Sequence, residues 1–190
     1  SVAFDWVGTY LETRFTGGKL SVKVSETGTS YYNVFVDGKL HKVVKVCGTD
    51  TLIHLVSGID KRIHSLKIQK RSEGEFGKIT VHQFVLSGSG RLAEEPAVRT
   101  RHIEFIGNSL TCGYGTDGKH RDEPFLVETE NCNLTFASMV ARYYDADYTL
   151  IAHSGRGAAR NYGDSVRVSK VTMKDRMLNT FDEDLTHKWN

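Results

Sequence analysis

The chain has 190 residues, 39% of them hydrophobic and 25% charged, which is the composition of a globular protein with one or two domains. Its formal net charge of +2 argues against nucleic acid or a membrane as a partner, because such partners select strongly basic surfaces. No apolar run approaches the roughly 20 residues that cross a bilayer, and residues 1–6 have neither the basic nor the apolar region of a signal peptide, which leaves open an earlier one that has been removed.

The first half of the chain has the pattern of antiparallel strands, because short segments alternate apolar and polar side chains between turn-forming residues. The expected strands are 10–15, 20–24, 31–36, 40–46, 51–56, 62–69 and 78–86. Asp37-Gly38 predicts a tight hairpin, since this pair readily adopts positive φ angles. Turns are also expected at 26–29 and 48–50. Short strands at this spacing predict a β-sandwich or jelly roll over residues 1–97.

Several side chains of this half are assigned to the surface or the core from the same pattern. The basic residues Lys67, Lys70 and Arg71 are interpreted as the solvated face and end of a strand. The strand histidines are expected at the surface or rim: His41, His54, His64 and His82. Three aromatic residues are expected in the core, with stacking on sugar rings as the alternative: Trp6, Tyr31 and Tyr32.

The pattern changes after a polar connection at residues 88–100, where we expect a domain boundary. The next expected elements are a strand at 102–106, a helix at 134–144 and a strand at 147–152. Strand, loop, helix and strand in this order begin a parallel α/β unit, which we expect to occupy residues 98–190. Residues 166–185 have a weak helical period, so a further helix there stays open.

The three cysteines, Cys47, Cys112 and Cys132, have neither metal-type spacing nor the even count of a disulfide framework. Buried free thiols are expected, with a Cys112–Cys132 bridge as the alternative. No pair of histidines has metal-binding spacing, so no metal and no other cofactor is predicted.

Both strands of the predicted parallel pair end in small polar residues, where α/β sheets place their sites. Ser109 follows the first strand, and Gly155 lies in the loop after the second. A serine hydroxyl beside backbone N–H groups is the arrangement that acyl transfer needs. Because Gly-x-Ser after a strand is common, an ordinary loop is the competing interpretation.

Residues 103–115, Ile-Glu-Phe-Ile-Gly-Asn-Ser-Leu-Thr-Cys-Gly-Tyr-Gly, resemble the first signature block of the SGNH (GDSL-type) hydrolases and, more narrowly, of carbohydrate esterase family 2. Residues 154–163 are similar to the second block of that family, and residues 128–131 also fit. The first half is similar to the family's N-terminal jelly roll. The resemblance implies an all-β jelly-roll sandwich followed by a three-layer α/β SGNH hydrolase domain, incomplete in this chain.

The resemblance also implies roles for individual residues. Ser109 is the nucleophile, and the backbone N–H groups of Ser109 and Gly155 belong to the oxyanion hole. Tyr114, Arg160 and Asn161 are candidate cleft residues. The implied activity is removal of O-acetyl groups from xylan or glucomannan through an acyl-serine, outside the cell or in the periplasm. The partner is then an acetylated oligo- or polysaccharide. A carbohydrate-binding protein without catalysis and an SGNH lipase or thioesterase are the alternatives.

Two positions depart from the family pattern. Asn108 stands where the superfamily commonly has Asp, and either side chain supports the turn through hydrogen bonds. The family's base is a late His, often in Asp-x-x-His, and residues 184–187 match that motif. We interpret His187 as a chance match, because about ninety residues after the linker are too few for a whole hydrolase domain. We therefore expect the base to lie outside the chain and the chain itself to be inactive. His153 is expected to pack or hydrogen-bond, with catalysis as the alternative.

Overall fold

A computed structural model describes residues 1–189 of the chain. Its contacts form two compact units. The first comprises Ser1–Phe4, Tyr10–Gln69 and Gly77–Val98, and the second comprises Asp5–Thr9, Lys70–Phe76 and the chain from Arg99 onward. The domain boundary expected near residue 97 stays a prediction, and no sequence feature indicated that two short early segments join the second unit. Among the described residues, no helix has the length and apolarity to cross a membrane.

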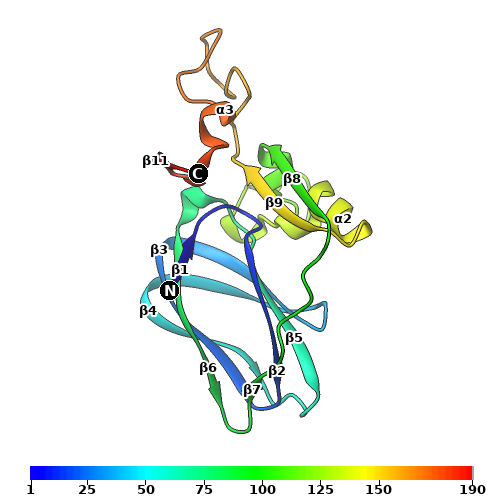
Figure 1. Cartoon of the computed structure of the whole chain (residues 1–190). Coiled ribbons are helices and arrows are strands. Elements are labelled where there is room, and N and C mark those ends of the chain that lie inside the picture. Colours follow the sequence, from blue (N-terminus) through cyan, green and yellow to red (C-terminus); the bar gives the residue numbers. More distant parts are fainter. Residues whose placement is uncertain (190) are drawn as a thin grey trace. The chain divides into compact units, whose positions relative to one another are not determined.

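The first unit is a curled antiparallel sheet (Figure 1). Its strands are β1 (Val2–Phe4), β2 (Tyr10–Thr16), β3 (Lys19–Val36), β4 (Lys39–Ser57), β5 (Ile63–Lys70), β6 (Ile79–Ser87) and β7 (Arg91–Leu92). They follow the order β1-β6-β3-β5-β2-β7, with β4 paired to β3. Inward-facing apolar side chains such as Phe15, Leu20 and Leu55 are fully buried in its core. The sandwich-like β half expected from the sequence is confirmed.

The loops between these strands differ in part from the prediction. The hairpin at Asp37 and Gly38, with φ of 50° and 75°, joins β3 to β4 as expected. The turns expected at 26–29 and 48–50 are wrong, because β3 and β4 run for 18 and 19 residues and stay paired through both stretches. Shifts of register between residues 24 and 29 absorb the irregular sequence, as β-bulges do, so the strand continues instead of reversing.

Charged residues of the first half are more buried than the pattern predicts. His64 is buried, with ring nitrogens 2.7 Å and 3.0 Å from carboxylate oxygens of Asp37 and Asp60. Lys70 and Arg71 are fully buried and not solvated. The surface prediction is therefore wrong for these three residues, because local alternation does not reveal a distant partner that makes burial of a charge acceptable.

The cysteine and aromatic predictions hold with one exception. All three cysteines are free, and Cys112 and Cys132 are buried as expected. Cys47 is exposed, which corrects the expectation for that residue. The aromatic residues expected in the core are buried (Trp6 and Tyr32) or partly buried (Tyr31).

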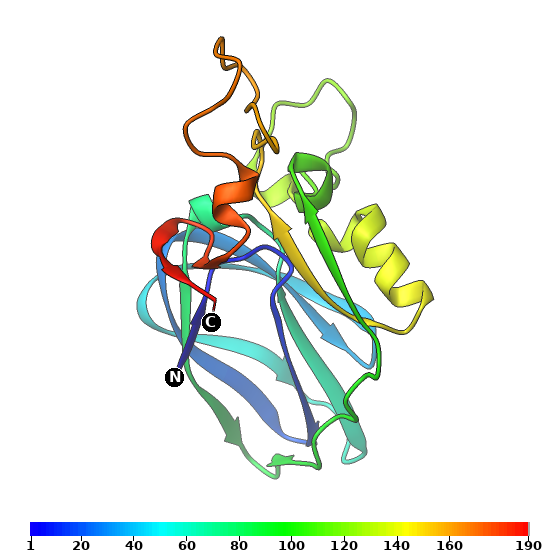
Figure 2. The same cartoon turned by 45° about the horizontal axis from the view of Figure 1, so that its top comes forward.

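The second unit contains the small α/β part. Strands β8 (His102–Gly107) and β9 (Asp147–Ala152) pair in parallel, and α2 (Phe136–Tyr143) lies beside them (Figure 2). The remaining elements are η1 (Gly74–Phe76), α1 (Ser109–Cys112), η2 (Val127–Thr129), η3 (Cys132–Leu134), α3 (Met173–Arg176), β10 (Asn179–Phe181) and β11 (Asp184–Lys188). The helix expected over 134–144 is shorter, because Thr135 caps α2 with extended backbone. In 166–185, one helical turn is followed by an antiparallel hairpin and not by a longer helix.

Candidate active site

Ser109 is the first residue of α1, and Asn108 alone separates it from the end of β8. Asn108 caps this turn, since its side-chain oxygen accepts the N–H of Leu110 at 3.2 Å. The turn ends at Gly113, whose φ of 88° suits glycine and whose added Cβ would lie 2.5 Å from the carbonyl oxygen of Asn131. Residues 108–113 therefore fold as a short capped turn that presents the serine at the end of the strand.

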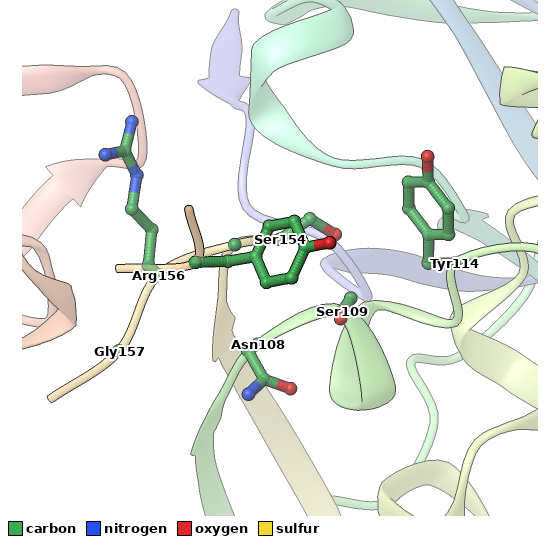
Figure 3. A pocket seen from close by; sticks show the side chains of 8 residues that line it. Asn108, Ser109, Tyr114, Ser154, Arg156 and Gly157 are labelled. Atoms are coloured by element: carbon green, nitrogen blue, oxygen red, sulfur yellow. The ribbon is translucent and has the colours of Figure 1, made fainter. Parts of the chain in front are cut away.

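A pocket of about 620 Å³ opens beside Ser109 (Figure 3). Its lining comes from two loops: Asn108, Ser109, Tyr114, Ser154, Gly155, Arg156, Gly157 and Tyr162. Ser109 is partly exposed, and among the described residues no partner binds its hydroxyl. The predicted nucleophile and the predicted oxyanion donor Gly155 thus line one cavity, together with Tyr114.

The loop after β9 is held by its own backbone and by Asn161. Gly155, with φ of 73°, accepts the N–H of Tyr162 at 2.8 Å. Asn161 accepts the N–H of Gly157 at 3.2 Å and donates to the carbonyl of Val171 at 2.8 Å. Asn161 therefore supports the loop and does not line the pocket, and the predicted cleft residue Arg160 is exposed outside the lining.

Two tyrosines frame the pocket with different constraints. Tyr114 stacks on Phe125, with ring centroids 3.7 Å apart and planes 11° apart, and its N–H donates to the carbonyl of Ser109 at 3.1 Å. Tyr162 is 92% exposed. The ring of Tyr114 is thus fixed against Phe125, and the ring of Tyr162 is open to solvent.

No histidine lies among the described residues that line the pocket. His187 is in β11, where its side chain is 72% exposed and its Nδ1 lies 2.5 Å from a carboxylate oxygen of Asp184. His153 is buried, and its Nδ1 lies 2.8 Å from Asp182. Both histidines are therefore engaged by nearby aspartates away from the pocket lining.

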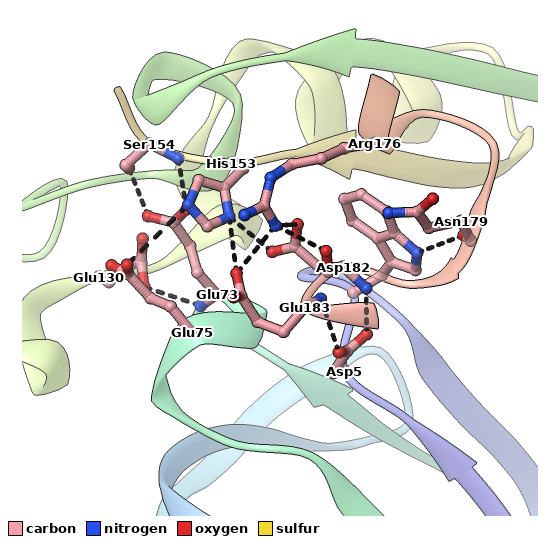
Figure 4. A network of polar contacts seen from close by, with 11 residues as sticks. Asp5, Glu73, Glu75, Glu130, His153, Ser154, Arg176, Asn179, Asp182 and Glu183 are labelled. Atoms are coloured by element: carbon pink, nitrogen blue, oxygen red, sulfur yellow. Dashed lines mark hydrogen bonds and ion pairs between the residues drawn. The ribbon is translucent and has the colours of Figure 1, made fainter. Parts of the chain in front are cut away.

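His153 belongs to a buried ionic network (Figure 4). Burial opposes a charge on this ring, but the hydrogen bond to Asp182 and its negative charge outweigh burial and raise the pKa of His153. Arg176 contacts the other oxygen of Asp182 at 3.0 Å. The N–H of Asp182 donates to Asp5 at 2.8 Å. This network joins the end of β9 to the chain around residue 182 and the early segment Asp5–Thr9.

A second polar cluster contains Ser154 and the buried residues Glu73 and Glu130 (Figure 4). Ser154 donates both its N–H and its hydroxyl to Glu73, which is fully buried. Glu73 in turn donates its N–H to Glu130 at 2.9 Å. Burial and the negative charge of Glu73 raise the pKa of Glu130 to about 10, so Glu130 is a neutral acid at pH 7. Burial likewise raises the pKa of Cys112, which stays a thiol.

Comparison with known proteins identifies the family. Residues 1–96 match the family described as carbohydrate esterase 2 N-terminal. The chain belongs to carbohydrate esterase family 2. This family 2 chain is 30% identical over 186 residues to an acetylxylan esterase / glucomannan deacetylase of Cellvibrio japonicus, with 96% of the chain and 51% of the relative covered. It is 35% identical over 158 residues to the cellulase/esterase CelE of Acetivibrio thermocellus, with 83% of the chain and 19% of the relative covered.

Solved structures share the fold of this family 2 chain. A family two carbohydrate esterase from Clostridium thermocellum, in complex with cellohexaose, aligns with a TM-score of 0.91 and 32% identity. The alignment covers 99% of this chain and 56% of that one. The chain therefore spans about half the length of that structure, and the resemblance stated from the sequence is confirmed for the family.

Two groups of metal-ligand residue types gather in this family 2 chain, with ligand atoms within 4.8 Å of one another. They are Glu73 with Cys112 and Glu130, and His153 with Asp182 and Glu183. In the first group Ser154 already donates to both oxygens of Glu73, and in the second Arg176 already neutralises the carboxylates. The described residues of both groups therefore act as hydrogen-bond networks.

Sequence reasoning missed the charged residues behind the pocket. Glu73 lies between the expected strands 62–69 and 78–86, in the connection Ser72-Glu73-Gly74, where an acidic residue is ordinary. Glu130 lies in the segment 128–131 that resembles the family, which was the one available signal.

Proposed function

We propose that the protein is a serine esterase that removes O-acetyl groups from xylan or glucomannan of plant cell walls. The observation that carries this proposal is the unengaged Ser109 hydroxyl in one pocket with Gly155. Family membership supports the reaction type, and the printed activity of the Cellvibrio relative supports the substrate. The whole protein would then combine a jelly roll with a three-layer SGNH domain and act outside the cell or in the periplasm.

In the proposed reaction, the Ser109 hydroxyl attacks the acetyl carbonyl and forms a tetrahedral intermediate. The N–H groups of Ser109 and Gly155 stabilise the negative oxygen of that intermediate. Collapse releases the sugar hydroxyl and leaves acetyl-Ser109, which water then hydrolyses to acetate. A general base must accept the Ser109 proton. Because no pocket-lining residue described here is a histidine or carboxylate, we propose that the base comes from outside these 190 residues.

The test is Ser109→Ala in the full-length protein, assayed by acetate release from acetylated xylan and glucomannan. Removal of the nucleophile is expected to lower kcat by about 10³-fold or more. Ser89→Ala, a matched change at an exposed residue of the first unit, is the control and should leave the rate unchanged. Undiminished acetate release by Ser109→Ala would refute the proposal.

Carbohydrate binding without catalysis is the second candidate. A relative was solved in complex with cellohexaose, and the exposed Tyr162 ring borders the pocket of this chain. Calorimetry with xylo-, manno- and cello-oligosaccharides would detect such binding, and Tyr162→Ala should weaken it about tenfold. Binding by a full-length protein that releases no acetate would favour this function over the esterase.

A further inference from the structure

The carboxylate of Glu73 is a buried charge that the reaction outlined above does not use. Its two oxygens accept the N–H of Ser154, at 2.5 Å, and the hydroxyl of the same residue. Its side chain is fully buried, and so is that of Glu130. A charged acceptor with two donors from one residue holds that residue in position and orientation, because charge-assisted hydrogen bonds are strong and directional.

The residue that Glu73 holds is next to the proposed oxyanion donor. The N–H of Gly155 belongs to the peptide unit that begins at Ser154. Ser154 and Gly155 both line the pocket beside Ser109. The contacts with Glu73 fix the Cα of Ser154, and the turn bond from the N–H of Arg156 to the carbonyl of His153 at 3.3 Å limits rotation of the peptide that follows. Together they restrict the direction in which the Gly155 N–H points, on which oxyanion stabilisation depends.

A second buried carboxyl group, that of Glu130, lies next to Glu73 and accepts its N–H. Glu130 is held neutral by burial and by the charge of Glu73, as its raised pKa indicates. One oxygen of Glu130 accepts the N–H of Glu73. The other oxygen has no hydrogen-bond partner among the described residues. A neutral Glu130 adds no second negative charge beside the carboxylate that Ser154 contacts.

The same segment, Lys70–Phe76, also holds the loop on the Ser109 side. Arg71 donates its Nε to the carbonyl of Glu130 at 2.7 Å and its Nη2 to the carbonyl of Glu128 at 2.8 Å. It also pairs with Asp117 at 2.6 Å. One short segment thus supplies Glu73 to the loop that contains Gly155. It also supplies Arg71 to the loop whose residue Asn131 bonds Gly113.

We propose that Glu73 is a positioning residue for the oxyanion hole, acting through Ser154 on the direction of the Gly155 N–H. This inference rests on the proposed esterase function. It makes Glu73 part of the arrangement that supports the transition state, although it touches neither the substrate nor Ser109.

The experiment compares Glu73→Gln, Ser154→Ala and wild type in the full-length protein, with rates corrected by active-site titration with an acyl phosphonate. Glu73→Gln keeps the shape but removes the charge and one acceptor, so kcat should fall about tenfold while KM changes less than about twofold. Ser154→Ala removes the hydroxyl donor and should lower kcat by a smaller factor. The backbone ¹H–¹⁵N resonance of Gly155 should shift or broaden in both variants.

Glu75→Gln is the matched control, because Glu75 lies in the same segment, is partly exposed and contacts His153 at 3.9 Å instead of Ser154. It should leave kcat and the Gly155 resonance as in wild type. A Glu73→Gln protein with wild-type kcat per titrated site and an unmoved Gly155 resonance would overturn the inference. The resonance is read without turnover, so an inactive wild type would refute the esterase proposal and still leave the Glu73 contact testable.

Discussion

The two units of the chain bury different kinds of side chain. The first unit is centred on apolar residues such as Phe15 and Leu55, packed between strands. The second buries a group of charged residues that includes Glu73, Asp182 and Arg176. Apolar packing tolerates a substitution that keeps volume, whereas a buried polar network depends on every partner being present. The structural half and the proposed catalytic half should therefore respond differently to conservative changes.

The largest expected loss of stability comes from a substitution that leaves a cavity in the core of the first unit. Phe15→Ala should lower the free energy of unfolding by about 4 kcal/mol, because Phe15 is fully buried. Phe15→Leu, which keeps much of the volume, should cost about 1–2 kcal/mol. Urea unfolding followed by intrinsic fluorescence measures both. If the two variants were equally destabilised, packing volume would not be what stabilises this unit.

The next largest loss of stability is expected in the ionic network of the second unit, from a substitution that keeps the shape of the side chain. Asp182→Asn removes the charge that contacts His153 and Arg176, so we expect a loss of about 3 kcal/mol despite equal volume. Hydrogen exchange at the β9 amides provides the measurement. A loss below that of Phe15→Leu would contradict the contrast between the units.

A smaller effect is expected at the turn that carries the serine. Gly113→Ala forces an L side chain to a φ of 88° and against the backbone of Asn131, so it should cost about 2 kcal/mol. Gly38→Ala is the control, because its φ of 75° is similar but nothing lies near its added Cβ. Thermal unfolding should show a larger loss at Gly113. Equal losses would mean that φ strain alone, without the close contact, sets the cost.

The effect that is smallest at acidic pH, and that grows as pH rises, concerns Glu130. Its folded pKa of about 10 lies above its ordinary value of 4.5, so the stability that its neutral form contributes is present below pH 4.5 and is lost as pH rises toward 10. Glu130→Gln cannot ionise and should match wild type near pH 4.5. It should then become the more stable protein as pH rises, because wild type must either keep a buried proton or bury a second charge. Parallel stability curves from pH 4.5 to 9 would show that Glu130 ionises freely.

The sequence predicted what short-range pattern and family likeness encode. Alternation located the strands, Asp37-Gly38 located the hairpin, and the segment around Ser109 located the serine of the pocket. The hydrophobic pattern failed to predict burial where a partner distant in sequence changes the environment of a side chain. Arg71 was interpreted as solvated, yet its partners Asp117 and Glu130 lie 46 and 59 residues away in sequence. No local period distinguishes such a buried charge from an exposed one.

The separation of the second unit into Asp5–Thr9, Lys70–Phe76 and the chain from Arg99 onward affects how the protein can be recombined. A crossover placed between the two halves of the gene would separate Arg71 and Glu73 from the loops that they contact, and both loops would lose their buried hydrogen-bond partners. Exchange of the front half between relatives should therefore succeed only when those two short stretches travel with their own C-terminal partners. Because of these contacts, a functional exchange has to keep both halves from the same relative.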